Sequence, residues 1–305
     1  MKPISETKGT ILMLLSIVCF TANTLVVRAL SIHYPGCDGW QVTLFRGVAG
    51  MLVVVSLYSG SRSLRLKSLI DRPKIVVRGI LGAGGVVIYY LTIIELGAAR
   101  AVVINLTYPI FAALLAAIVL KESLGLSRLT WIITGFIGLM IFMGPEALDR
   151  GLSGYDLLAV GGALLAASVV VLIRTLHQSE HGSTIFASQA GFCILVAAPS
   201  SLGESPDLPT PVIIGLSLAG LIVAAGQLTM TFAYRHLAVS KGSSMQMLLP
   251  VFTAAGAWLF FEEVLNAIEL SGAALTLVAT AMVNRGTSKS PLKMPSNPTP
   301  IHDNT

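Results

Sequence analysis

The sequence predicts an all-α membrane protein with ten transmembrane helices in two inverted five-helix repeats. Hydrophobic residues make up 54% of the 305 positions and charged residues only 11%, whereas a typical globular domain is about 25% charged. Apolar stretches of about 20 residues, enough to cross a bilayer, recur along the whole chain. The two halves of the chain also align with one another at a constant offset. Most of the surface is therefore expected to face lipid.

Ten apolar stretches are expected to form the spans. Lipid offers no hydrogen-bond partner to free backbone groups, so spans this apolar should be helical. The first span is longer than the apolar region of a signal peptide, and no A-x-A-like cleavage site follows it, so we expect it to be retained. The spans are residues 9–30, 40–58, 75–96, 101–120, 129–144, 155–173, 184–202, 212–234, 243–261 and 267–284.

The distribution of positive charge predicts the orientation. With ten spans both termini lie on one side, and all but four of the 20 Lys and Arg residues then fall on that side. The four on the other side are Arg28, Arg46, Arg100 and Arg150. The positive-inside rule predicts that both termini lie in the cytoplasm. We expect the protein to reside in the cell inner (plasma) membrane. The tail at residues 285–305 is expected to be disordered cytoplasmic chain, and short basic clusters between spans do not indicate nucleic-acid binding.

An internal repeat is the most informative feature of the sequence. Residues 108–123 align without gaps to residues 249–264, and the pairs Pro109 with Pro250 and Glu122 with Glu263 share an offset of 141 positions. We expect one repeat over residues 9–144 and the other over 155–284. Five spans per repeat is an odd number, so the second repeat enters the membrane inverted, as in many secondary transporters. The same offset also pairs Phe111 with Phe252, Gly79 with Gly220, Gly85 with Gly226, Leu96 with Leu237 and Asn105 with Gln246.

These features resemble the EamA family of the drug/metabolite transporter superfamily. The resemblance rests on the two five-span halves, on LFR at 44–46, and on the P-x-F…E-x12-G run from Pro109 through Glu122 to Gly135. It implies a central cavity lined mainly by spans 1, 3, 4, 6, 8 and 9, in a family whose members move amino acids, nucleotide derivatives, S-adenosylmethionine and other polar metabolites. The second half departs from the pattern, because GFCIL at 191–195 stands where a second LFR is expected, which leaves Arg46 without a symmetric partner.

Two amide residues are the strongest candidates for substrate binding. Asn105 and Gln246 each lie four residues before a proline, Pro109 and Pro250, within a span. A proline cannot donate to the carbonyl four residues back, so each position offers an amide beside an unpaired backbone oxygen. We expect the prolines to act as hinges and the amides to face a common cavity. The alternative is that each amide only joins neighbouring helices by a hydrogen bond.

Further polar residues at helical spacing extend this candidate site. Tyr108 shares a face with Asn105, and Tyr234 continues a polar stripe on the eighth span; either tyrosine could instead serve packing alone. Arg46 could form an internal salt bridge or contact an anionic substrate, whereas Arg28 is expected to extend to the interface. The full set of expected substrate-binding residues is Asn105, Tyr108, Gln246, Gln227, Thr231, Tyr90, Tyr89, Asn23 and Arg46.

Sequence motifs for enzymatic chemistry are not evident. There is no phosphate-binding G-x-x-x-x-G-K-[ST] motif, no Asp or Glu deep within a predicted span, and no cofactor or metal site is expected from three scattered cysteines. The pattern H-x-x-E-H at 177–181 is interpreted as a solvated loop. Glu122 and Glu263 are interpreted as structural residues with a local partner such as Lys121 or a neighbouring helix end.

The expected function is transport of a small polar or amphipathic metabolite, of the amino-acid or nucleotide-derivative class, by alternating access. A membrane lipid-carrier flippase and a non-transporting membrane scaffold are the alternatives. The expected partners are the small-molecule substrate and the lipid bilayer, and no nucleic-acid partner is expected. The sequence does not specify whether the chain forms a homodimer. Substrate identity, direction of transport and any coupling ion are not specified by the sequence.

Overall fold

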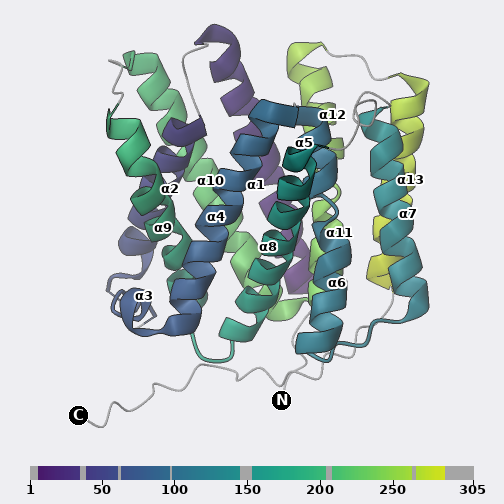
Figure 1. Cartoon of the computed structure of the whole chain (residues 1–305), viewed down its shortest axis with the longest axis horizontal. Coiled ribbons are helices and arrows are strands. Elements are labelled where there is room, and N and C mark those ends of the chain that lie inside the picture. The colour runs from purple at the N-terminus through teal and green to yellow at the C-terminus, as the bar shows by residue number, and fades with distance from the viewer. Residues whose placement is uncertain are drawn as a thin grey trace.

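A computed structural model describes residues 6–34, 39–60, 63–96, 98–144, 153–203, 208–262 and 266–285, and within these residues it contains helices and no strands. The helices form one bundle with roughly parallel axes (Figure 1). In chain order they are α1 Glu6–His33, α2 Gly39–Tyr58, α3 Ser68–Asp71, α4 Pro73–Leu96, α5 Ala98–Asn105, α6 Tyr108–Val119, α7 Leu126–Met143, α8 Gly154–Leu176, α9 Gly182–Gly203, α10 Thr210–His236, α11 Val239–Gln246, α12 Leu249–Phe261 and α13 Ala267–Arg285.

Seven helical stretches among the described residues are long and apolar enough to cross a membrane. They correspond to α1, α2, α7, α8, α9, α10 and the pair α11–α12. Two shorter apolar helices, Tyr108–Val119 and Ala267–Val283, accompany them. The predicted all-helical membrane architecture is thus confirmed, while the count of ten spans stays a prediction.

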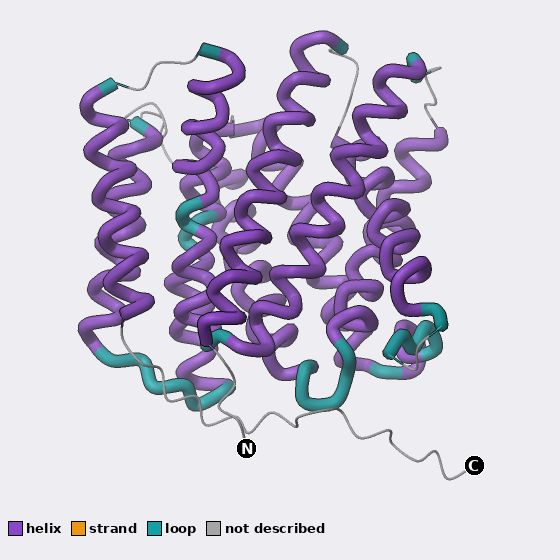
Figure 2. Tube along the Cα trace, turned by 180° about the vertical axis from the view of Figure 1, so that it is seen from behind, coloured by secondary structure: helices purple, strands orange, loops and turns teal. Residues whose placement is uncertain are grey.

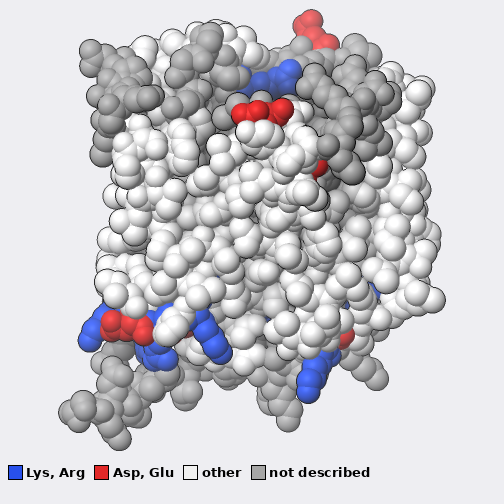
Figure 3. Space-filling view, in the orientation of Figure 1, with Lys and Arg blue, Asp and Glu red and all other residues white. Residues whose placement is uncertain are grey.

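The surface of the bundle is apolar between its two ends. Large side chains such as Ile118, Leu195 and Leu259 are exposed, and Lys, Arg, Asp and Glu gather near the two ends of the visible face with an uncharged band between them (Figure 3). Small polar side chains such as Ser243 and Thr276 are buried instead. This distribution is the one expected for a bundle whose outside contacts lipid tails.

Glycines allow the closest helix contacts. A Cβ atom added at Gly220 on α10 would lie 2.8 Å from the backbone oxygen of Phe45 on α2. One at Gly79 on α4 would lie 3.0 Å from the backbone oxygen of Ser188 on α9. Beside these contacts, α1 packs on α10 and α12, α2 on α9, α4 and α6 on α8, and α7 on α13.

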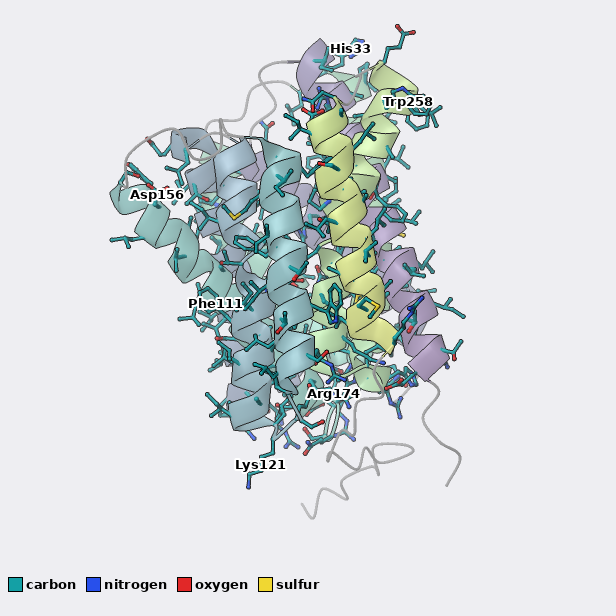
Figure 4. The ribbon with its side chains drawn as sticks, turned by 90° about the vertical axis from the view of Figure 1, so that its right-hand side faces the viewer. His33, Phe111, Lys121, Asp156, Arg174 and Trp258 are labelled. Atoms are coloured by element: carbon teal, nitrogen blue, oxygen red, sulfur yellow. The ribbon has the colours of Figure 1, made fainter. Side chains whose placement is uncertain are left out.

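The chain crosses the bundle repeatedly, so that α1 begins and α13 ends near the same end, toward the bottom of Figures 1 and 2. At this end Lys241 Nζ, on α11, lies 3.2 Å from Glu6 Oε2 in the first turn of α1. The labelled side chains of Lys121 and Arg174 also lie toward this end, whereas His33 and Trp258 lie at the opposite one (Figure 4). We call the end that holds Lys121 and Arg174 the basic end.

Candidate functional site

Two of the predicted spans are broken in the middle. α5 ends at Asn105 and α6 begins at Tyr108, while α11 ends at Gln246 and α12 begins at Leu249. The prolines Pro109 and Pro250 occupy the first turns of α6 and α12, a position that needs no backbone N–H donor. α5 and α12 lie toward one end of the bundle and α6 and α11 toward the other (Figure 1). Each span is therefore two half-helices that meet inside the bundle.

The two amides at the breaks have different environments. Gln246 is 5% exposed, and its Nε2 donates a hydrogen bond to Met13 Sδ on α1 at 3.1 Å. A thioether is a weak acceptor, so this amide keeps most of its hydrogen-bonding capacity. Asn105 is half-buried, and no hydrogen bond joins the two amides in the described part of the chain.

Two tyrosines connect α6 with α10 beside Gln246. Tyr108 and Tyr234 are buried in the main core, and the Tyr234 hydroxyl has no hydrogen-bond partner among the described residues. A Cβ atom at Gly242 on α11 would lie 2.5 Å from Tyr234 Cε1 and 3.1 Å from Met13 Cε. Tyr108, Tyr234, Gln246 and Met13 thus form one buried group between α1, α6, α10 and α11.

Arg46 and Asn23 line a small cavity against the first half of α10, farther along the helix from Tyr234. Arg46 Nη2 donates to Gln227 Oε1 at 2.8 Å. The volume open to the centre of a water molecule is about 10 Å³, enough for about one water, so in this conformation the cavity is too small for a metabolite. The lining residues are Asn23, Val42, Arg46, Leu216, Ala219, Gly220 and Val223.

The remaining expected site residues are less informative. Thr231 is buried, and its Oγ1 donates to the backbone oxygen of Gln227 at 2.8 Å, so its hydroxyl is satisfied within α10. Tyr89 is half-buried on α4. The side chain of Tyr90 and all of Glu263 lie outside the described residues.

Sequence reasoning missed a second arginine–glutamine pair. Arg78 on α4 is fully buried, and its Nη2 donates to Gln189 Oε1 on α9 at 2.8 Å. By the positive-inside rule Arg78 is expected on the cytoplasmic side, together with Arg72 and Lys74. The available signal was its position after Ile75, inside the predicted span.

A charged cluster closes the basic end of the bundle. The Glu122 carboxylate accepts from the backbone N–H of Val239 at 3.0 and 3.2 Å, and Arg174 Nε lies 3.9 Å from Glu122 Oε1. Arg174 Nη1 also donates to the backbone oxygens of Tyr234 and Arg235, each at 2.8 Å. Glu122 therefore caps the N-terminus of α11, where a negative charge is favourable.

Of the two partners expected for Glu122, the structure shows the neighbouring helix end and not Lys121. Lys121 is exposed, and the carboxylate contacts Val239 and Arg174 instead. Burial raises the pKa of Glu122 above its ordinary value, and the hydrogen bond from Val239 and the charge of Arg174 offset part of this rise. The cluster joins α6, α8, α10 and α11 at one end of the bundle.

The interpretation of residues 177–181 as a solvated loop is wrong for His177 and Glu180, which are buried, whereas Gln178 and Ser179 are exposed. His177 is 4% exposed, and its Nε2 lies 2.7 Å from the backbone oxygen of Thr231, to which it donates. Burial lowers the pKa of His177 to about 4, with smaller contributions from Arg235 and Arg174 and opposition from the Thr231 hydrogen bond. Glu180 is buried 3.9 Å from Arg72 Nε. Within the described residues no three His, Cys, Asp or Glu side chains gather as a metal site.

Comparison with known proteins gives the family. The model of the EamA-like transporter family matches residues 7–144 and again 153–285. The pseudopaline exporter CntI of Pseudomonas aeruginosa is 26% identical over 281 residues, 91% of this chain and 96% of the relative. A riboflavin transporter of Vibrio cholerae is 30% identical over 199 residues, 62% of this chain and 63% of the relative.

A solved crystal structure supports the fold alone: it superposes with a TM-score of 0.76 at 16% identity and covers 91% of this chain and 97% of its own. The family match extends over nearly the whole chain, and the relatives are named as transporters of small metabolites. Together with the apolar helices, these findings identify the chain as an integral membrane protein that belongs to the EamA-like transporter family.

Proposed function

We propose that this protein carries a small polar or amphipathic metabolite, of the amino-acid or nucleotide-derivative class, across the membrane by alternating access. In this proposal residues 9–144 and 155–284 are two inverted repeats of five spans, followed by a cytoplasmic tail at 285–305. The two separate matches to the family model support the division into repeats. The relatives that are named as transporters favour a carrier over an enzyme.

The helix contacts support an inverted repeat. When the spans are numbered in order, α2 packing on α10 joins spans 2 and 8, and α4 packing on α9 joins spans 3 and 7. The two repeats are related by a shift of five spans. This shift converts the contact between spans 2 and 8 into the contact between spans 7 and 3. The paired glycines agree with this exchange, because Gly220 lies against α2 and Gly79 lies against α9.

The pair of broken spans is the observation that carries the proposal. Both breaks fall just before a proline, at equivalent positions of the two repeats. Non-helical backbone inside a membrane is tolerated only against protein or a watery cavity, and transporters place substrate sites at such breaks. We propose that Asn105, Tyr108 and Gln246 contact substrate when the cavity opens, together with Asn23, Tyr89, Tyr90, Gln227, Thr231 and Arg46.

The Glu122–Arg174 contacts support a gate at the basic end. Glu122 joins the end of one broken span to the start of the other, so the two half-helices α6 and α11 are held together at this end. We propose that this end faces the cytoplasm of an inner-membrane protein, because the positive-inside rule favours basic residues there, and that the closed contacts exclude the cytoplasm.

Reconstitution tests the proposed function. The purified protein is screened by thermal shift against a metabolite panel, and the compounds that stabilise it are then measured for uptake into proteoliposomes. We expect at least one compound to raise the melting temperature and to enter in a saturable manner. Folded protein that moves no compound of the panel would contradict the proposal.

A further inference from the structure

Arg78 is a buried cation whose hydrogen-bonding capacity is largely unused. It is 0% exposed, and Nη2 donates to the neutral Gln189 side chain. Its Nε and Nη1 atoms have no hydrogen-bond partner among the described residues. A guanidinium stays charged and offers five N–H donors, and a buried charge without a counter-charge is strongly unfavourable. The site is therefore incomplete in this conformation.

Arg46 repeats the same arrangement on the neighbouring helix pair. Its Nη2 also donates to a glutamine, Gln227, at 2.8 Å, and Arg46 lines the cavity with Asn23. Neither arginine forms an ion pair with a carboxylate in the part of the chain that the structure describes. Glutamine orients a guanidinium by accepting a hydrogen bond but cannot neutralise it. Two positive charges thus stay uncompensated within the bundle.

Arg46 and Arg78 lie in the same region of the bundle. α9, which carries Gln189, packs against both α2 and α4, the helices that carry Arg46 and Arg78. Cys193, buried one turn after Gln189, lies within electrostatic range of both guanidinium groups. At Gly82 an added Cβ would lie 2.5 Å from Arg78 Nη1, so the absence of a side chain there makes room for the guanidinium.

We propose that Arg46 and Arg78 form an oxyanion site, and that the transported metabolite carries a carboxylate or phosphate group that binds there. This inference rests on the proposed transport function and names its substrate class. A guanidinium binds such groups through hydrogen bonds from several N–H donors, and Arg78 keeps unused donors at Nε and Nη1. Binding of the anion supplies the missing counter-charge, which gives the substrate a large advantage over neutral solutes.

Matched solutes test this selectivity. Uptake into proteoliposomes is measured for succinate against succinamide and for glucose 6-phosphate against glucose, which separates carboxylate from phosphate recognition. We expect at least one acid to enter faster than its neutral partner. Arg46→Gln and Arg78→Gln should each reduce its uptake at least about tenfold, as expected for loss of a hydrogen-bonded charge. Arg46→Lys should keep part of the uptake, and Arg28→Gln, at an exposed position on α1, should keep all of it.

The melting temperature of the ligand-free protein distinguishes a binding role from a structural one. Because Arg78→Gln removes an uncompensated buried charge, we expect an equal or higher melting temperature for this variant. A lower melting temperature combined with unchanged uptake of the acid would overturn the proposal. Stabilisation by phosphatidylglycerol but by neither soluble acid would also overturn it and would assign the site to a lipid headgroup.

The broader metabolite screen separates this inference from the proposed function. If the wild type carries a neutral metabolite and neither acid, or if both arginine variants keep full uptake of the acid, the anion site is wrong and the transporter stands. If the folded wild type carries no compound at all, the proposed transport function fails and the anion site fails with it.

Discussion

The carboxylate of Glu122 accepts a hydrogen bond from the backbone N–H of Val239 and so connects the end of α6 to the start of α11. These helices are halves of the two broken spans, so one side chain connects the mobile parts expected of an alternating-access carrier. In this hydrogen bond the buried negative charge lies at a helix N-terminus, where it is favourable, and Arg174 lies nearby. In the proposed alternating-access cycle, opening of the basic end would break this hydrogen bond, so we expect replacements of Glu122 to change both stability and transport.

Replacement of Glu122 should separate the hydrogen bond from the charge. Glu122→Gln keeps an oxygen that can accept from Val239 and loses the ion pair with Arg174. Glu122→Ala leaves the N–H without a partner, which costs about 1–3 kcal/mol. We expect the melting temperature to decrease from the wild type to Glu122→Gln and further to Glu122→Ala.

The control for this series is Glu95→Gln, at an exposed carboxylate on α4, which should melt like the wild type. An Ala variant at position 122 as stable as the wild type would show that the contact contributes nothing to the closed state. Uptake is measured in parallel. Its change relative to the wild type should be larger for the Ala variant than for the Gln variant.

The fold was more predictable than the site because its determinants are local. Runs of about 20 apolar residues specify membrane helices from the sequence alone, and Pro109 and Pro250 mark the places where two of them break. The partners of Arg78 and Glu122 are 111 and 117 positions away in the chain. Only the packing of α4 on α9, and of α6 near α11, brings these groups together, and no local pattern encodes it.

The loop at residues 177–181 illustrates the same limit. Two histidines, a glutamate and a glycine in the six residues 177–182 have the composition of a solvated turn, yet His177 is buried against Thr231. The neighbouring backbone oxygen compensates for burial of the polar ring. Whether a polar side chain finds such a partner depends on tertiary packing and cannot be derived from composition.

His177 should make stability depend on pH. Its pKa is about 4 in the folded protein and 6.5 ordinarily, so between these values the unfolded chain binds a proton that the folded protein does not. Stability should therefore be complete above pH 6.5 and should fall as the pH drops toward 4. Melting temperature measured across this range checks the direction.

His177→Gln isolates the contribution of this ring, because a glutamine amide can donate to Thr231 but does not titrate. The variant should lose less stability on acidification than the wild type. The lowered pKa of His181 acts in the same direction, and the raised pKa values of Glu122 and Glu180 act in the opposite one. Since these groups are common to both proteins, equal pH profiles would exclude a role for His177.

The helix breaks should be needed for transport and not for folding. Pro109→Ala and Pro250→Ala restore an N–H that can donate to the carbonyl of Asn105 or Gln246 and so allow each span to become continuous. We expect unchanged or higher melting temperatures and slower uptake. Pro199 lies inside α9 without a counterpart in the repeat, so Pro199→Ala should leave uptake unchanged; equal effects of all three changes would argue against a special role for the breaks.

The amides at the breaks should bind substrate rather than hold the bundle together. Interhelical polar contacts in membranes average about 0.6 kcal/mol, and Gln246 donates only to a weak thioether acceptor on Met13. Asn105→Leu and Gln246→Leu should therefore fold with little change in melting temperature. If either amide contacts substrate in the poorly solvated cavity, its loss should cost about 1–3 kcal/mol, or roughly ten- to a hundredfold in apparent affinity.

Thr130→Val is the matched control for these two variants, because it removes a polar group at an exposed position on α7. It should change neither affinity nor stability. Apparent affinity for uptake and melting temperature, measured together on the three variants, separate the two roles of the amides. A purely structural pair would lower the melting temperature and leave the affinity unchanged, and substrate binding would then have to be sought at Arg46 and Arg78 alone.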